Sequence, residues 1–98
     1  MVKHMIIWSF KDGEFDKTER AEQIKNALEG LEGKIEGLVK MRILTDKIES
    51  SSGDIMMDST FVDNSALQFY QNHPLHKEIA NGLVRPSVEL RLSYDYEE

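Results

Sequence analysis

Three histidines and the tyrosine between them are the residues of this chain most able to carry chemistry. His4 lies in an apolar run near the start of the chain, while His73 and His76 flank Pro74 and follow Tyr70 closely. Imidazole titrates near neutral pH and can act as a general base, and a phenol can donate a hydrogen bond to a developing oxyanion. The chain has no cysteine, which excludes disulfides, thiolate zinc sites and cysteine nucleophiles. Any chemistry must therefore come from His, Tyr, Asp and Glu.

Each histidine also has a purely structural interpretation, and spacing alone favours it. His4 can be a core histidine with one backbone hydrogen bond, while His73 and His76 can cap a helix that bends at the proline. The spacing of three between His73 and His76 would allow a shared metal ion, but no third ligand follows at a telling distance. We therefore predict no metal and no cofactor.

Composition narrows the class of protein. The 98 residues include 18 acidic and 12 basic side chains, a net charge of -6, which disfavours binding to nucleic acid. Hydrophobic residues make up 40%, enough for a folded core. The longest apolar stretch, Met5 to Trp8, is far shorter than the ~20 residues that cross a bilayer, and no leader pattern opens the chain. We expect a single soluble domain over residues 1–98, located in the cytoplasm and without membrane contact.

Hydrophobic periodicity predicts the elements that must position these side chains. Alternation over 2–10 predicts a strand that turns His4 to the same side as Ile6 and Trp8. Three- and four-residue spacing predicts a helix from about 16 to 33 and a second, interrupted helix from about 63 to 86. Residues 38–46 and 54–62 form a predicted hairpin around a serine-rich loop, and residues 88–96 form the last strand.

The predicted order, β-α-β-β-α-β, is that of the ferredoxin-like α+β fold, with both helices on one face of a four-stranded antiparallel sheet. Met5 and Ile7 lie on the side of the first strand that helices leave open. A second copy packing sheet to sheet would cover that side, so we expect a homodimer. On the last strand we expect the apolar set to lie beside His4, under the helices. That set is Leu90, Leu92, Tyr94 and Tyr96.

Four segments of the sequence, taken in order, resemble the stress-responsive A/B barrel family, the dimeric α+β barrel proteins. They are Val2-Lys3-His4, Ile35 to Val39, Phe69 to His76, and Tyr94-Asp95-Tyr96. The resemblance implies a ferredoxin-like protomer whose sheet packs on the sheet of its partner to form a central barrel. Most members of this family have no assigned activity. The expected function is therefore that of a homodimer with a small-molecule pocket between sheet and helices, and without assigned catalysis.

An alternative function comes from the similarity to one member of the family, the plant polyketide cyclase that forms olivetolic acid by intramolecular aldol condensation. That similarity implies His76 as base, Tyr70 as donor to an enolate oxygen, His4 as an orienting group and Asp95 as the partner that fixes a histidine tautomer. The ligand would be a small, apolar or polyketide-like ketone. Strict alternation places Asp95 opposite Tyr94 on its strand, so we expect it to reach the site only through a bulge.

Two positions depart from the cyclase and separate the two hypotheses. Leu28 and Ile55 are apolar where the cyclase has polar pocket residues. A closed apolar core around His4 and His76 would favour a binding or structural dimer. An open cavity with these side chains converging on it would favour the enzyme.

Overall fold

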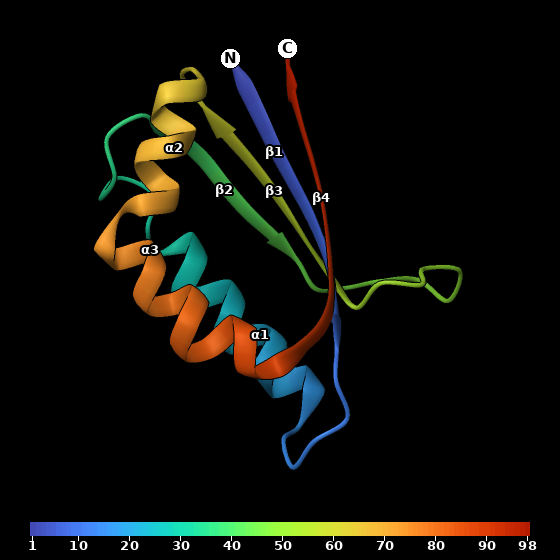
Figure 1. Cartoon of the computed structure of the whole chain (residues 1–98). Helices are drawn as coiled ribbons and strands as arrows, with labels where there is room; N and C mark the ends of the chain where they lie inside the picture. Colours follow the sequence, from blue (N-terminus) through green and yellow to red (C-terminus); the bar gives the residue numbers. More distant parts are fainter.

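The fold has two layers, a sheet and the helices that cover one of its faces, and the chain leaves the opposite face of the sheet open (Figure 1). The computed structural model describes all residues, 1–98. The elements, in chain order, are β1 (Val2–Phe10), α1 (Lys17–Glu29), β2 (Leu38–Leu44), β3 (Ile55–Phe61), α2 (Asn64–Asn72), α3 (Pro74–Ile79), the π-helical turn η1 (Ala80–Val84), the 3-10 turn η2 (Arg85–Ser87) and β4 (Val88–Glu97).

The sheet has the order β2-β3-β1-β4, and all three pairings are antiparallel. Together with the two helical crossovers on one face, this order confirms the ferredoxin-like α+β prediction (Figure 1). The ends of the elements differ from the predicted ends by a few residues. The first helix ends at Glu29, and the chain then passes through turns to Gly33, which adopts a φ of 86° that favours glycine.

The helices begin at residues with capping side chains. The Asp16 carboxylate accepts the backbone N–H of Glu19 at 3.0 Å, and the Asp63 carboxylate accepts that of Ala66 at 2.8 Å. One stripe of α1 is buried against the sheet, as its spacing predicts, and its centre is Ile24. None of the helices has the length and the apolar composition needed to cross a membrane.

The predicted bend in the second helical region is a sharp break. The α2 helix ends before His73, and Pro74 then opens α3, because proline lacks the N–H that a continuing helix would need. His73 Nδ1 accepts the backbone N–H of Leu75 at 3.1 Å and so caps α3. The chain continues through a π-helical turn, an irregularity that is frequent at functional sites. After this break, α3 and η1 pass over the part of the sheet around His4, since His76, Ala80 and Val84 line the same pocket as His4.

The face assignment predicted for the last strand is wrong. In the β1–β4 register His4 lies directly across from Asp95 and Trp8 across from Arg91, so these polar residues face the helices. The apolar set of β4 pairs with Met5 and Ile7 on the open face. Alternation tells which residues share a face but not which face is covered, and here the more apolar side of the strand points away from the helices.

The open face of the sheet is strongly apolar. Ile7 is 40% exposed, Leu92 is 58% exposed and Tyr94 is 71% exposed. They are neighbours on the two adjacent strands β1 and β4, because Ile7 pairs with Leu92 and Met5 pairs with Tyr94. Isolated apolar residues are ordinary on a protein surface, whereas a contiguous apolar group of this kind is uncommon on a monomeric protein.

Candidate functional site

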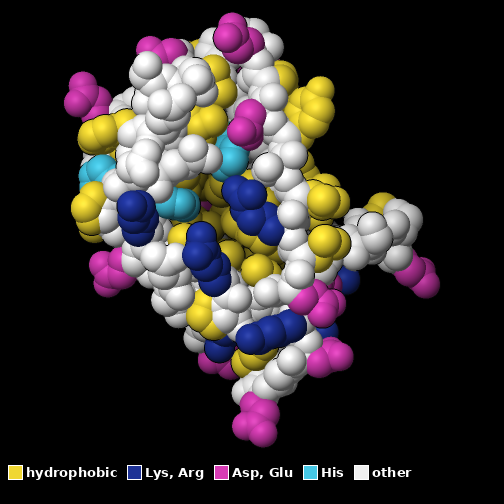
Figure 2. All heavy atoms as spheres, in the orientation of Figure 1, with side chains coloured by type: hydrophobic (Ala, Val, Ile, Leu, Met, Phe, Trp, Pro, Cys, Tyr) yellow, Lys and Arg dark blue, Asp and Glu magenta, His cyan; other side chains and the backbone are white.

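A pocket of about 330 Å³ opens between the sheet and the α3–η1 segment. Figure 2 shows a hollow on this face of the molecule, with hydrophobic side chains at its floor and histidine and basic side chains around it. The sheet and α1 supply the floor, and α2, α3 and the turns that follow supply the wall. The lining residues are His4, Ile6, Trp8, Leu28, Met57, Tyr70, Gln71, His76, Ala80, Val84, Arg85 and Arg91.

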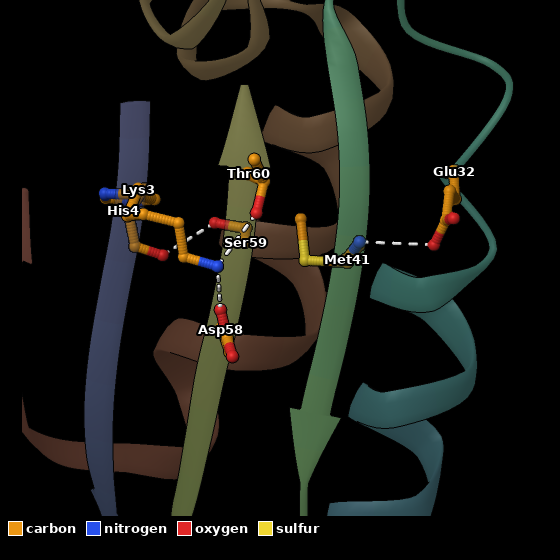
Figure 3. A network of polar contacts seen from close by, with 7 residues as sticks. All are labelled: Lys3, His4, Glu32, Met41, Asp58, Ser59 and Thr60. Atoms are coloured by element: carbon orange, nitrogen blue, oxygen red, sulfur yellow. Dashed lines mark hydrogen bonds and ion pairs between the residues drawn. The ribbon is translucent and has the colours of Figure 1, made fainter. Parts of the chain in front are cut away.

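His4 is buried by the alternation of β1 and is held from two sides. Its ring nitrogen Nδ1 is in close hydrogen-bond contact with the Asp95 carboxylate on the neighbouring strand. Its carbonyl oxygen accepts the hydroxyl of buried Ser59 at 2.7 Å, across the β1–β3 pair (Figure 3). A carboxylate at Nδ1 favours the tautomer that carries the proton there, which leaves Nε2 as an acceptor. No group of the chain is hydrogen-bonded to Nε2.

Tyr70 and His76 lie together on the helical wall of the pocket. Their ring centroids are 4.2 Å apart, and the Tyr70 ring also packs on Phe61, with ring centroids 5.0 Å apart. Tyr70 Oη and His76 Nδ1 are both buried, yet neither has a hydrogen-bond partner in the chain. Such unpaired buried polar groups are rare and costly in folded proteins, so each one calls for a partner from outside the chain, such as a ligand or a water molecule.

The surroundings set the charge state of both groups. Burial raises the pKa of the Tyr70 phenol well above its ordinary value, so the hydroxyl keeps its proton at neutral pH. Burial is the main cause that lowers the pKa of His76 to about 4, and the positive charges of Arg91 and Arg85 act in the same direction. His76 is therefore a neutral imidazole at pH 7. The site holds a proton donor and an unprotonated acceptor side by side.

The structure brings three of the four predicted site residues to the pocket itself. His4, Tyr70 and His76 line it, and Asp95 stands behind His4 as its hydrogen-bond partner. Asp95 needs no bulge to reach this position, which corrects the expectation above. The register of β4 shifts only between Ser9 and Phe10 of β1, at the far end of the pairing. The carboxylate bonds to His4 and not to His76.

The remaining candidates are divided between the pocket and other parts of the structure. His73 caps α3 and does not line the pocket, as its structural interpretation predicts. Leu28 lines the pocket, whereas Ile55 belongs to the core and does not. No group of three or more His, Asp or Glu side chains lies close enough together to hold a metal ion.

Sequence reasoning missed the two arginines of the pocket. Arg85 comes from η2, and Arg91 comes from β4, where it pairs across from Trp8 on the helix-facing side. A signal for Arg91 was present, because it is four residues from Asp95 and therefore on the same face of the strand. No comparable signal marks Arg85, which reaches the pocket only through the π-helical and 3-10 turns.

Comparison with known proteins identifies the family. The profile of the stress responsive A/B barrel domain matches residues 2–98, so the chain belongs to this family. This match confirms the resemblance noted in the sequence. Among curated protein sequences, none is similar enough to this chain to count as a relative.

Solved structures agree with the fold. A dimeric protein of unknown function with a ferredoxin-like fold from Bacteroides fragilis is 26% identical, with a TM-score of 0.87 over 99% of this chain and 95% of that one. A protein from Arabidopsis thaliana is 30% identical, with a TM-score of 0.82 over 100% of this chain and 95% of that one. A dimeric ferredoxin-like protein of unknown function from Jannaschia, at 22% identity, has a TM-score of 0.80 over 99% of this chain and 98% of that one.

Proposed function

We propose that the pocket binds a small ketone and that the chain catalyses proton transfer at the carbon next to its carbonyl group. The observation that carries this proposal is the pair of buried polar atoms without partners, Tyr70 Oη and His76 Nδ1, at a pocket that both residues line. A carbonyl ligand offers an acceptor for the phenol and an acidic C–H for a neutral imidazole. Pocket and perturbed pKa values together are the expected signature of such a site.

In the proposed step, His76 takes a proton from the α-carbon of the ketone. The C–H electron pair becomes the carbon–carbon double bond of an enolate, and the negative charge moves to the former carbonyl oxygen. The Tyr70 hydroxyl donates a hydrogen bond to that oxygen, which it can do because its raised pKa keeps it protonated. His4, fixed by Asp95, accepts a hydrogen bond from the substrate through Nε2. In an aldol closure, the enolate carbon would then attack a second carbonyl of a polyketide-like substrate.

The Asp95 contact makes His4 a second candidate for the base. A carboxylate that accepts Nδ1–H stabilises the imidazolium formed when Nε2 takes a proton, as in other Asp–His pairs. His76 lines the pocket beside Tyr70, whereas His4 is the histidine that contacts a carboxylate, that of Asp95. Replacement of each histidine by glutamine therefore separates the two roles.

The test follows exchange of the α-protons of phenylacetone in D2O by proton NMR. We expect exchange above the buffer rate for the unchanged protein and a loss of about 100-fold or more on His76→Gln. If His4 is the base, His4→Gln and Asp95→Asn show the large loss instead. His73→Gln is the matched control, since this histidine is outside the pocket. Exchange at the buffer rate with phenylacetone bound would refute catalysis and leave a binding protein.

We also propose that a second copy of the chain covers the open face of the sheet. The neighbours from Bacteroides fragilis and Jannaschia are dimeric. The apolar group around Ile7, Leu92 and Tyr94 supports a sheet-to-sheet interface, because homodimer interfaces are apolar at their centre. Polar contacts lie on the same face: Lys3 Nζ is 2.6 Å from the Asp58 carboxylate and also reaches Thr60 (Figure 3). A sedimentation mass of 11.3 kDa at micromolar concentration would refute the dimer.

A further inference from the structure

We infer that the pocket recognises a carboxylate, held by Arg85 and Arg91, so that its ligand is a small organic acid with an apolar body. This inference rests on the proposed function for the location of the ligand and adds the chemical class to it. Both arginines line the pocket, next to the wall formed by Tyr70 and His76. Nothing in the composition of the chain, which is acidic overall, anticipates a cationic pocket.

Both guanidinium groups lack a partner within the chain. Neither the Arg85 nor the Arg91 side chain makes a hydrogen bond or an ion pair, whereas the sheet residue Lys3 has the carboxylate of Asp58 as partner. Asp95, four residues from Arg91 on the same strand face, is engaged by His4, and Glu89, two residues from Arg91, makes no hydrogen bond or ion pair with it. Guanidinium groups left free beside an apolar cavity are available to an incoming anion.

The lining of the pocket has one sign of charge. Its charged side chains are two arginines, and it contains no aspartate or glutamate, although acidic residues outnumber basic ones by 18 to 12 in the whole chain. A concave site with cationic groups and low-dielectric walls concentrates the field that attracts anions. After burial, the charges of Arg91 and Arg85 also contribute to the lowered pKa of His76, which lines the same pocket. The pocket is therefore a positive site on a negative protein.

The form of the pocket favours a carboxylate over a phosphate. Phosphate sites commonly add backbone N–H groups from a glycine-rich turn or a helix N-terminus. No glycine lines this pocket, and Ala80 and Val84 lie inside the π-helical turn. The planar guanidinium fork matches a carboxylate with two parallel hydrogen bonds. Ile6, Trp8 and Leu28 form an apolar floor that suits the aromatic or alkyl part of a ligand, and the pocket has a volume of about 330 Å³.

A bound carboxylate would also act on the proposed base. The charged or titratable groups around His76 are His4, Tyr70, His73 and the two arginines. An anion at the guanidinium groups offsets the positive charge that, after burial, lowers the pKa of His76, so binding raises that pKa. By linkage, protonation of His76 strengthens anion binding by the same factor. An acidic substrate would thus make His76 a stronger base on binding.

The test compares phenylacetate with phenylacetone, which has nearly the same shape and no charge, by isothermal titration calorimetry at low salt. We expect phenylacetate to bind at least 10-fold more tightly. Arg91→Gln and Arg85→Gln should each weaken phenylacetate binding by about 10-fold to 100-fold and leave phenylacetone binding within about twofold. Arg91→Lys should lose part of the affinity, because it keeps the charge but not the fork. Lys77→Gln, on α3 but outside the pocket, is the control and should change neither affinity.

Equal affinities for the two probes, or the same loss from Lys77→Gln as from the arginine variants, would overturn the inference. Tighter binding of inorganic phosphate than of phenylacetate would replace the carboxylate by a phosphate. Circular dichroism of each variant shows whether it is folded. If a glutamine variant does not fold, Arg91→Lys still tests the role of the guanidinium group. Phenylacetate binding involves no turnover, so it can succeed when proton exchange of phenylacetone fails. The two proposals therefore fail separately.

Discussion

We expect the hydroxyl of Tyr70 to lower the stability of the folded protein and to stabilise the enolate in the proposed reaction. The variant Tyr70→Phe separates these two effects. The side chain is fully buried, and Oη is the only atom that the change removes. Because this atom has no hydrogen-bond partner in the chain, no hydrogen bond compensates for the free energy of removing it from water. An unsatisfied buried polar group costs about 1–3 kcal/mol. The phenylalanine ring keeps the packing on Phe61 and His76.

We therefore expect Tyr70→Phe to raise the free energy of unfolding by about 1–2 kcal/mol, within the range for one unsatisfied group. For a domain of about this size, each kcal/mol moves the melting temperature by about 4–8 °C. The same variant should lower the rate of phenylacetone α-proton exchange by about 100-fold to 1000-fold, the usual loss for one oxyanion donor. A gain in stability together with a loss of activity is the expected sign of a site residue.

The assay is urea unfolding followed by circular dichroism at one fixed protein concentration, because dimerisation adds to the apparent stability. Tyr94→Phe makes the same chemical change on the other face of the sheet, where the side chain is 71% exposed. It should leave proton exchange unchanged, because this side chain lies on the face of the sheet opposite the pocket. A Tyr70→Phe protein less stable than the unchanged protein by 1 kcal/mol or more would mean that the hydroxyl has a partner in the folded state. That result would remove the observation on which the proposed function rests.

Three further changes test the fold, the interface and the charge state of the site. In urea unfolding, Gly37→Ala should lower the free energy of unfolding by about 2–3 kcal/mol and Gly33→Ala by about 1 kcal/mol. Both glycines have positive φ, but only at Gly37 would the new Cβ lie 2.5 Å from another side chain. Ile7→Asp should abolish the dimer in sedimentation and yield aggregated or unfolded chains, while Phe69→Asp, at a more exposed position on α2, should remain dimeric. A stable Ile7→Asp monomer would contradict the interface. The free energy of unfolding should fall as pH decreases from about 6.5 to about 4. In this range His76 takes up a proton in the unfolded chain but not in the folded chain, where its pKa is lowered to about 4. A His76→Gln protein with the same pH slope would contradict this.

Local signals in the sequence determined the elements and their order. Alternation over β1 placed His4 on the covered side with Ile6 and Trp8, and the capping residues and Pro74 marked the helix starts and the break. These features depend on neighbours within a few residues, so periodicity and propensity suffice to predict them. The order of the elements then left few topologies, of which the ferredoxin-like sheet is one.

The tertiary structure decided which groups meet. His4 and Asp95 are 91 residues apart, and their contact depends on the register between the first and last strands. The same register turned the apolar side of β4 to the open face and Arg91 to the pocket, where Arg85 joins it through the turn that follows α3. Strand alternation fixes relative sides only, and the covered side is chosen by the packing of the whole sheet against helices or against a partner. The charge of the pocket is therefore a property of the fold and could not be obtained from an acidic sequence.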